Sequence, residues 1–129
     1  MPITMLYAGA LGMVLLVLSI RVIQGRGKTK VNLGDGGNET MVRLMRGQAN
    51  FVEYVPMILV LLGLLETQGV SPKVLHALGA SLLVGRLLHG YAFAFSSYFP
   101  VGRFGGTLLT QLVLGAAAAL CLWNGIHAL

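Results

Sequence analysis

The chain has 129 residues, of which 56% are hydrophobic and 10% are charged, and its formal net charge is +5. Soluble domains usually carry about a quarter charged residues, so the composition excludes an ordinary water-soluble protein. The length leaves no room for a second domain. We therefore predict one domain, residues 1–129, that is embedded in a membrane.

Four long apolar segments follow one another along the chain. A helix needs about 20 mostly apolar residues to cross the bilayer core, and the segments at residues 3–20, 50–65, 74–95 and 107–129 approach or exceed that length. The first segment lacks the basic start and the small-residue cleavage site of a signal peptide, so we expect it to be retained. The sequence predicts an all-α membrane protein, a bundle of four transmembrane helices.

The connections between these segments indicate the orientation. The second connection has only Lys73 and the third adds Arg103, whereas the first holds six of the nine basic residues. Because cytoplasmic connections are enriched in Lys and Arg, we expect the first and third connections in the cytoplasm and both termini outside. Charges that flank helices without interleaved aromatic residues favour contact with anionic lipids over nucleic-acid binding. The six residues are Arg21, Arg26, Lys28, Lys30, Arg43 and Arg46.

The connections also carry turn signals. The stretch "NLGDGGNE" (residues 32–39) is typical of a tight turn, and it lacks the lysine and hydroxyl residue of a phosphate-binding loop. Asn38 or Thr40 is expected to cap the next helix, and Pro72 suits an early helical position. In the third connection, Pro100 and the three glycines of "VGRFGG" predict an irregular loop with a sharp path.

A polar stripe enters the second apolar segment. Arg43, Arg46, Asn50 and Glu53 are three, four and three residues apart, so they share one helical face. An ionised residue at the centre of a membrane helix costs about 2.5–3.5 kcal/mol on insertion scales. Glu53 therefore requires either a charged partner or a hydrated cavity.

The third apolar segment offers a counterpart to this stripe. Antiparallel packing of the two helices would bring Arg86, with His89 one turn on, to the depth of Glu53. Two interpretations stay open: a structural ion pair between Glu53 and Arg86, or a polar pocket that opens to the cytoplasm and binds a charged ligand. The number of polar side chains favours the pocket. They are Arg43, Arg46, Gln48, Asn50, Glu53, Arg86 and His89.

The charges of such a pocket restrict its ligand. Several cations around one carboxylate suit a zwitterionic, net-anionic molecule whose ammonium meets Glu53 and whose carboxylates meet the arginines. Four short helices leave little interior for a ligand, so we expect the pocket between subunits. Three histidines, one cysteine and scattered carboxylates make no recognisable metal site.

Two stretches resemble the signatures of a known family. "RLMRGQANFVEYVP" (residues 43–56) and "GRLLHGYAF" (residues 85–93) are similar to motifs of the MAPEG proteins, the membrane-associated proteins of eicosanoid and glutathione metabolism. The loop "GDGGNE" and the short length are most similar to their small bacterial branch. The resemblance implies a homotrimer in the bacterial inner membrane, with glutathione bound as co-substrate at the subunit interfaces near the cytoplasmic side.

The resemblance also implies roles for individual residues. An arginine at the start of the fourth helix, best matched by Arg103, stabilises the thiolate of glutathione in this family. An arginine after the first helix contributes as well, with Arg26 the nearer match and Arg21 the weaker one. The remaining expected contacts to glutathione are Arg46, Gln48, Asn50, Glu53, Tyr54, Arg86 and His89.

The resulting hypothesis is a glutathione transferase or peroxidase that acts on lipophilic electrophiles arriving from the bilayer. Eicosanoid synthesis is not expected, because Phe93 stands where the synthases carry a tyrosine and Phe104 replaces a residue with a hydroxyl. The alternative is a non-catalytic membrane protein that binds lipid headgroups or another small anion at the subunit interface. A small transporter is disfavoured, since the sequence has no inverted repeat.

Overall fold

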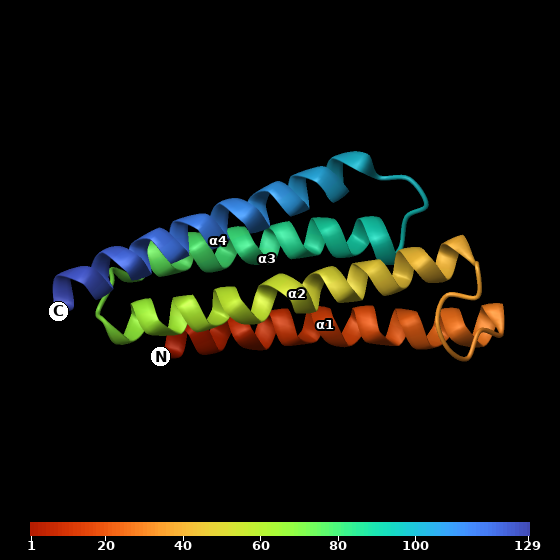
Figure 1. Cartoon of the computed structure of the whole chain (residues 1–129), viewed down its shortest axis with the longest axis horizontal. Helices are drawn as coiled ribbons and strands as arrows, with labels where there is room; N and C mark the ends of the chain where they lie inside the picture. The colour runs from red at the N-terminus through yellow and green to blue at the C-terminus, as the bar shows by residue number, and fades with distance from the viewer.

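The computed structural model describes all residues, 1–129, and consists of four helices that run up and down (Figure 1). Each helix is long and apolar enough to cross a membrane. The four predicted membrane helices are therefore confirmed, although each begins before its predicted apolar segment. They are α1 (Pro2–Thr29), α2 (Glu39–Thr67), α3 (Pro72–Ala94) and α4 (Pro100–Ala128).

Local sequence signals set the ends of α2 and α3. The Oδ1 of Asn38 accepts a hydrogen bond from the backbone N–H of Met41 at 3.1 Å, so the predicted cap of α2 is confirmed. Pro72 is the first residue of α3, where its missing N–H costs no helical hydrogen bond. The turn before α2 is also confirmed, with Gly36 and Gly37 at φ values of 59° and 71°.

The start of α4 differs from the prediction. Residues 100–106 were expected to form a loop, yet α4 begins at Pro100 and includes every glycine of "VGRFGG". Proline favours the first helical position, and the glycines let α4 approach α3 closely. A Cβ added at Gly106 would lie 2.5 Å from the carbonyl oxygen of Gly85 and 2.7 Å from the Cβ of His89. Gly106 therefore serves helix packing, and none of the three glycines breaks the helix.

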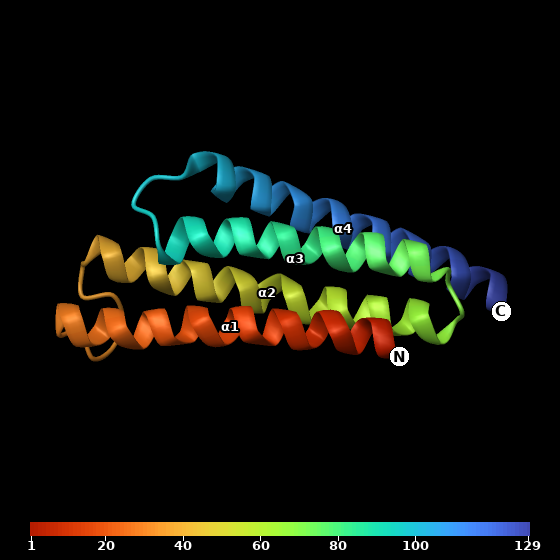
Figure 2. The same ribbon diagram turned by 180° about the vertical axis from the view of Figure 1, so that it is seen from behind.

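The helices pack unevenly. α3 and α4 make the most extensive contact, α2 touches all three others, and α1 does not touch α4. Figures 1 and 2 show α4 diverging from the α1–α2 pair towards the end where it begins. The first and third connections lie together at that end, and both termini lie at the other. The core of the bundle includes Leu11, Ile58, Leu62, Leu82 and Ala117, all of which are buried.

Glu66, near the end of α2, holds the first turn of α1. Its carboxylate accepts hydrogen bonds from the backbone N–H groups of Ile3 (2.9 Å) and Thr4 (2.7 Å) and from the Thr4 hydroxyl (2.6 Å). The first N–H groups of a helix have no partner within the helix, and its N-terminus favours a negative charge. Glu66 thus acts as a cap supplied by a neighbouring helix.

We expect Glu66→Ala to lower the midpoint of thermal unfolding in detergent, because it leaves the first turn of α1 without its acceptor. Glu66→Gln, which keeps one acceptor oxygen, should cause a smaller decrease. Gln68→Ala is the control, because Gln68 makes hydrogen bonds only through its backbone, which the substitution retains. Equal midpoints for Glu66→Ala and Gln68→Ala would contradict this role.

Candidate functional site

The outward face of α2 carries an exposed ion pair. Arg46 and Glu53 are two turns apart, and the Nη1 of Arg46 lies 3.8 Å from the Oε1 of Glu53. Their side chains are 59% and 50% exposed in the single chain, and theirs is the only ion pair in the structure. This half of the predicted stripe therefore points away from the bundle, on a helix that is apolar enough to span a membrane.

Arg86 lies inside the bundle and does not pair with Glu53. It is fully buried, and its Nη1 donates to the Oδ1 of Asn50 at 2.8 Å and to the Oγ1 of Thr110 at 3.4 Å. Of the two interpretations of these residues, the structural ion pair between Glu53 and Arg86 is thus wrong. The rotation of α2 that buries Phe51 turns Asn50 towards α3 and leaves Glu53 outside.

The interior cluster around Arg86 joins three helices. Its Nη2 donates to the Nδ1 of His89 at 3.2 Å, and the His89 ring stacks on Phe93 with centroids 4.5 Å apart. The Nε of Arg86 is buried without a hydrogen-bond partner in the chain. Thr110, which supplies the contact from α4, was missed by the sequence reasoning; its only signal was a hydroxyl residue in an apolar segment.

Gln48, Tyr54 and Arg26, which were predicted to contact a ligand, each have a partner within the chain. The Nε2 of Gln48 donates to the Oγ of Ser19 at 3.0 Å and so faces α1. Tyr54 is half-buried and packs against the apolar core. The Nη1 of Arg26 donates to the carbonyl oxygens of Val31 (3.3 Å) and Gly34 (2.9 Å), so this arginine holds the first connection in place.

Arg103 lies in the first turn of α4, at the end of the bundle where α2 also begins. It is exposed, and its guanidinium carbon lies 4.9 Å from the centroid of the Phe93 ring. Together with Arg43 it lines a small cavity of about 120 Å³ beside Ser97 and Tyr98. Arg43 also donates to the carbonyl oxygen of Ser96 and so fixes the third connection.

The structure thus divides the predicted site into two parts. The outward part, Arg46 and Glu53, offers one cation and one carboxylate on the surface of α2. The inward part, Asn50, Arg86 and His89, forms hydrogen bonds within the chain. The outward part can contact a ligand or a neighbouring subunit, whereas the inward part sets the position of the helices. No group of His, Cys, Asp or Glu side chains gathers that could hold a metal ion.

Comparison with known proteins identifies the family. The model of the MAPEG family matches residues 4–123. The inner membrane protein YecN of Escherichia coli strain K12 is 35% identical over 91 residues, which is 70% of each chain. YecN of Escherichia coli O6:H1 strain CFT073 matches to the same extent. No solved structure matches the chain. With a family match over nearly its whole length, the chain belongs to the MAPEG family.

Proposed function

We propose that this protein binds glutathione on the outward face of α2, where Arg46 and Glu53 meet a neighbouring subunit. The observation that carries the proposal is the exposure of this ion pair on a helix able to cross a membrane. An ionised side chain facing lipid costs several kcal/mol. A neighbouring subunit together with a polar ligand would remove the pair from lipid, so the charged face is best explained as part of a shared site.

The chemistry of glutathione fits the two side chains. The tripeptide is net anionic with one ammonium group, so its ammonium can bind the Glu53 carboxylate while a carboxylate binds the Arg46 guanidinium. Both are charge-assisted hydrogen bonds, and arginine can offer two parallel donors to a carboxylate. The face therefore offers complementary partners for both signs of charge on this ligand.

Arg103 is the proposed catalytic residue. A free thiol has a pKa near 8.5, so only a small part is thiolate at neutral pH. A guanidinium next to the sulfur favours the thiolate, which then forms a bond to an electrophilic carbon. The leaving group departs with the electron pair of the broken bond, or an addition product takes up the proton that the thiol released. Arg103 is exposed and makes no ion pair, so its charge is available for this role.

The oligomer and the orientation are part of the proposal. Apolar side chains flank the charged face, with Val52 and Met57 both exposed on α2, so only Arg46 and Glu53 make this face unsuited to lipid alone. The family resemblance supplies the number of subunits, three. The inner-membrane location of the relative YecN supports the same location here. The excess of Lys and Arg in the first connection supports a cytoplasmic position for it, with both termini outside.

Variants on this face test the proposal. We expect glutathione to raise the thermal unfolding midpoint of the purified protein in detergent, because a ligand that binds only the folded state stabilises it. Glu53→Gln and Arg46→Ala should reduce this shift without changing the subunit number, which light scattering measures. Asp35→Asn, the same carboxylate-to-amide change in the exposed first connection, should leave the shift intact. A wild-type protein without any shift at millimolar glutathione would refute the proposal.

One observation favours the non-catalytic alternative. Asn50, Arg86 and His89 are turned inwards, so the outward face has fewer polar groups than the sequence predicted. Such a face could bind a lipid headgroup or another small anion between subunits. Phospholipid that copurifies at the interface and that glutathione does not displace would favour this alternative over the transferase.

A further inference from the structure

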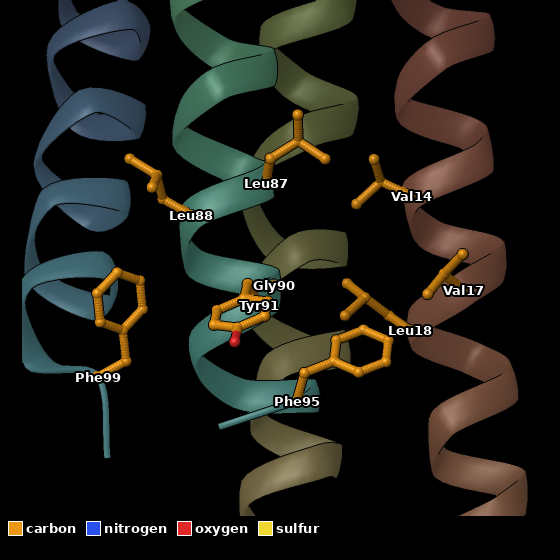
Figure 3. A pocket seen from close by; sticks show the side chains of 9 residues that line it. All are labelled: Val14, Val17, Leu18, Leu87, Leu88, Gly90, Tyr91, Phe95 and Phe99. Atoms are coloured by element: carbon orange, nitrogen blue, oxygen red, sulfur yellow. The ribbon is translucent and has the colours of Figure 1, made fainter. Parts of the chain in front are cut away.

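An apolar groove runs between α1 and α3 on the side of the bundle that α4 leaves uncovered. Its volume is about 400 Å³, within the range of roughly 300–1,000 Å³ typical of sites for small molecules. Figure 3 shows Val14, Val17 and Leu18 of α1 on one side and Tyr91 of α3 on the other, with the ring of Phe95, which follows α3, next to Leu18. The groove is open at the surface, where Val17 is 43% and Tyr91 55% exposed.

The positively charged side chain of Arg21 lies at one end of this groove. Arg21 follows Val17 and Leu18 by one turn of α1, and its guanidinium carbon lies 4.8 Å from the centroid of the Phe95 ring. Its Nε and Nη2 donate to the carbonyl oxygen of Ala94 at 2.9 and 2.7 Å, which anchors it there. No carboxylate pairs with Arg21, so its charge is uncompensated within the chain.

The depth of the groove in the membrane follows from the sequence of α1. The apolar segment of α1 ends at Ile20, so Arg21 is placed at the level of the headgroups. Val14 is seven residues earlier and hence about 10 Å deeper. An arginine at the headgroup level above an apolar groove suits an anionic phospholipid, because the phosphate and the start of the acyl chain lie at these two depths.

We propose that this groove binds an anionic membrane phospholipid, with a phosphate oxygen on Arg21 and one acyl chain along Val14, Val17 and Phe95. The cation provides the charge complementarity, and no residue of the lining is acidic, so a zwitterionic headgroup finds no partner for its ammonium. The site lies between α1 and α3 of one subunit. It is therefore separate from the Arg46–Glu53 face and does not depend on glutathione.

Native mass spectrometry of the detergent-solubilised protein tests the site. The protein is mixed with equal amounts of phosphatidylglycerol and phosphatidylcholine, and the retained lipid is counted per subunit. We expect preferential retention of phosphatidylglycerol, reduced roughly fivefold by Arg21→Gln, since one basic side chain near the surface contributes about that factor. Lys28→Gln, which removes an exposed cation of α1 outside the groove, should leave retention unchanged.

A second pair of variants tests the acyl-chain part. Val17→Trp fills the groove while keeping the Arg21 cation and should also reduce retention, whereas Met13→Trp, on the exposed side of α1 outside the lining, should not. Equal retention of both lipids by the wild type, or an equal effect of Lys28→Gln and Arg21→Gln, would overturn the proposal. So would a changed subunit number in Val17→Trp with lipid retention intact, because the groove would then be a contact between copies of the chain.

Discussion

Replacing Asn50 with leucine is expected to destabilise the protein strongly, although leucine is the more apolar residue and α2 is able to span a membrane. The Oδ1 of Asn50 is the closest acceptor of the fully buried Arg86, at 2.8 Å, and the Nε of Arg86 already lacks a partner. Hydrogen bonds to charged groups contribute about 1.5–3 kcal/mol, compared with about 0.6 kcal/mol for an average interhelical hydrogen bond in a membrane protein. We expect Asn50→Leu to lower the free energy of unfolding by about 1.5–3 kcal/mol, the value for a hydrogen bond to a charged group.

Further variants test whether the hydrogen bond between Asn50 and Arg86 is the cause of the destabilisation. Asn50→Asp keeps the acceptor and adds a counterion, so it should retain stability. The double variant Asn50→Leu with Arg86→Met should recover part of the loss, because it removes the buried charge together with its acceptor. Thermal unfolding in detergent measures these three variants and the single variant Arg86→Met, with Asn32→Leu in the exposed first connection as the control. The cluster is not stabilising if Asn50→Leu behaves like Asn32→Leu, or if the double variant loses as much as the two single variants combined.

The second large effect is expected at Gly106, where α4 touches α3. A Cβ at this position would lie 2.5 Å from the Gly85 carbonyl oxygen and 2.8 Å from the backbone nitrogen of His89. Neither atom belongs to a flexible side chain, so the helices must separate. Overpacking of this kind typically costs about 1–3 kcal/mol, and we expect Gly106→Ala to lower the unfolding midpoint accordingly.

The adjacent glycine is the matched control for Gly106. A Cβ at Gly105 would have no atom within 4 Å. Because alanine favours a helix over glycine by up to about 1 kcal/mol, Gly105→Ala should be neutral or stabilising. The change from glycine to alanine is thus expected to lower the unfolding midpoint at position 106 and to leave it unchanged or raise it at position 105. Equal midpoints of the two variants would show that α4 does not approach α3 at Gly106.

The sequence predicted the helices well because lipid leaves the backbone few alternatives. The lengths of the apolar segments, the Asn38 cap and the position of Pro72 all correspond to features of the structure. The failure at residues 100–106 has the same cause. Glycines and a proline indicate a loop in water, whereas among membrane helices they also permit close helix packing, and here Gly106 contacts Gly85.

The site was predicted less completely, because spacing alone does not fix the rotation of a helix. Asn50 and Glu53 share a face within about 60° at 3.6 residues per turn, yet one points into the bundle and the other out of it. Burial of Phe51 and Ile58 determines that rotation. Gln48 is about 160° from Arg46 around the same helix, which explains its contact with Ser19 on α1.

Some contacts could not be foreseen from the chain at all. Glu66 belongs to no recognisable motif in the sequence, yet it caps α1 across the bundle. Arg26 was expected to contact a ligand, yet it folds the connection that follows it. Both contacts depend on how whole helices and their connections pack against one another. A local sequence motif therefore cannot predict them.

The most direct test of the charged face on α2 is calorimetric titration of glutathione into the purified protein. We predict saturable heat for the wild type that Glu53→Gln reduces, with a thiolate absorption that appears on binding and is lost in Arg103→Ala. Heat indistinguishable from dilution, or binding that Glu53→Gln leaves unchanged, would contradict the assignment of Arg46 and Glu53 as a glutathione site.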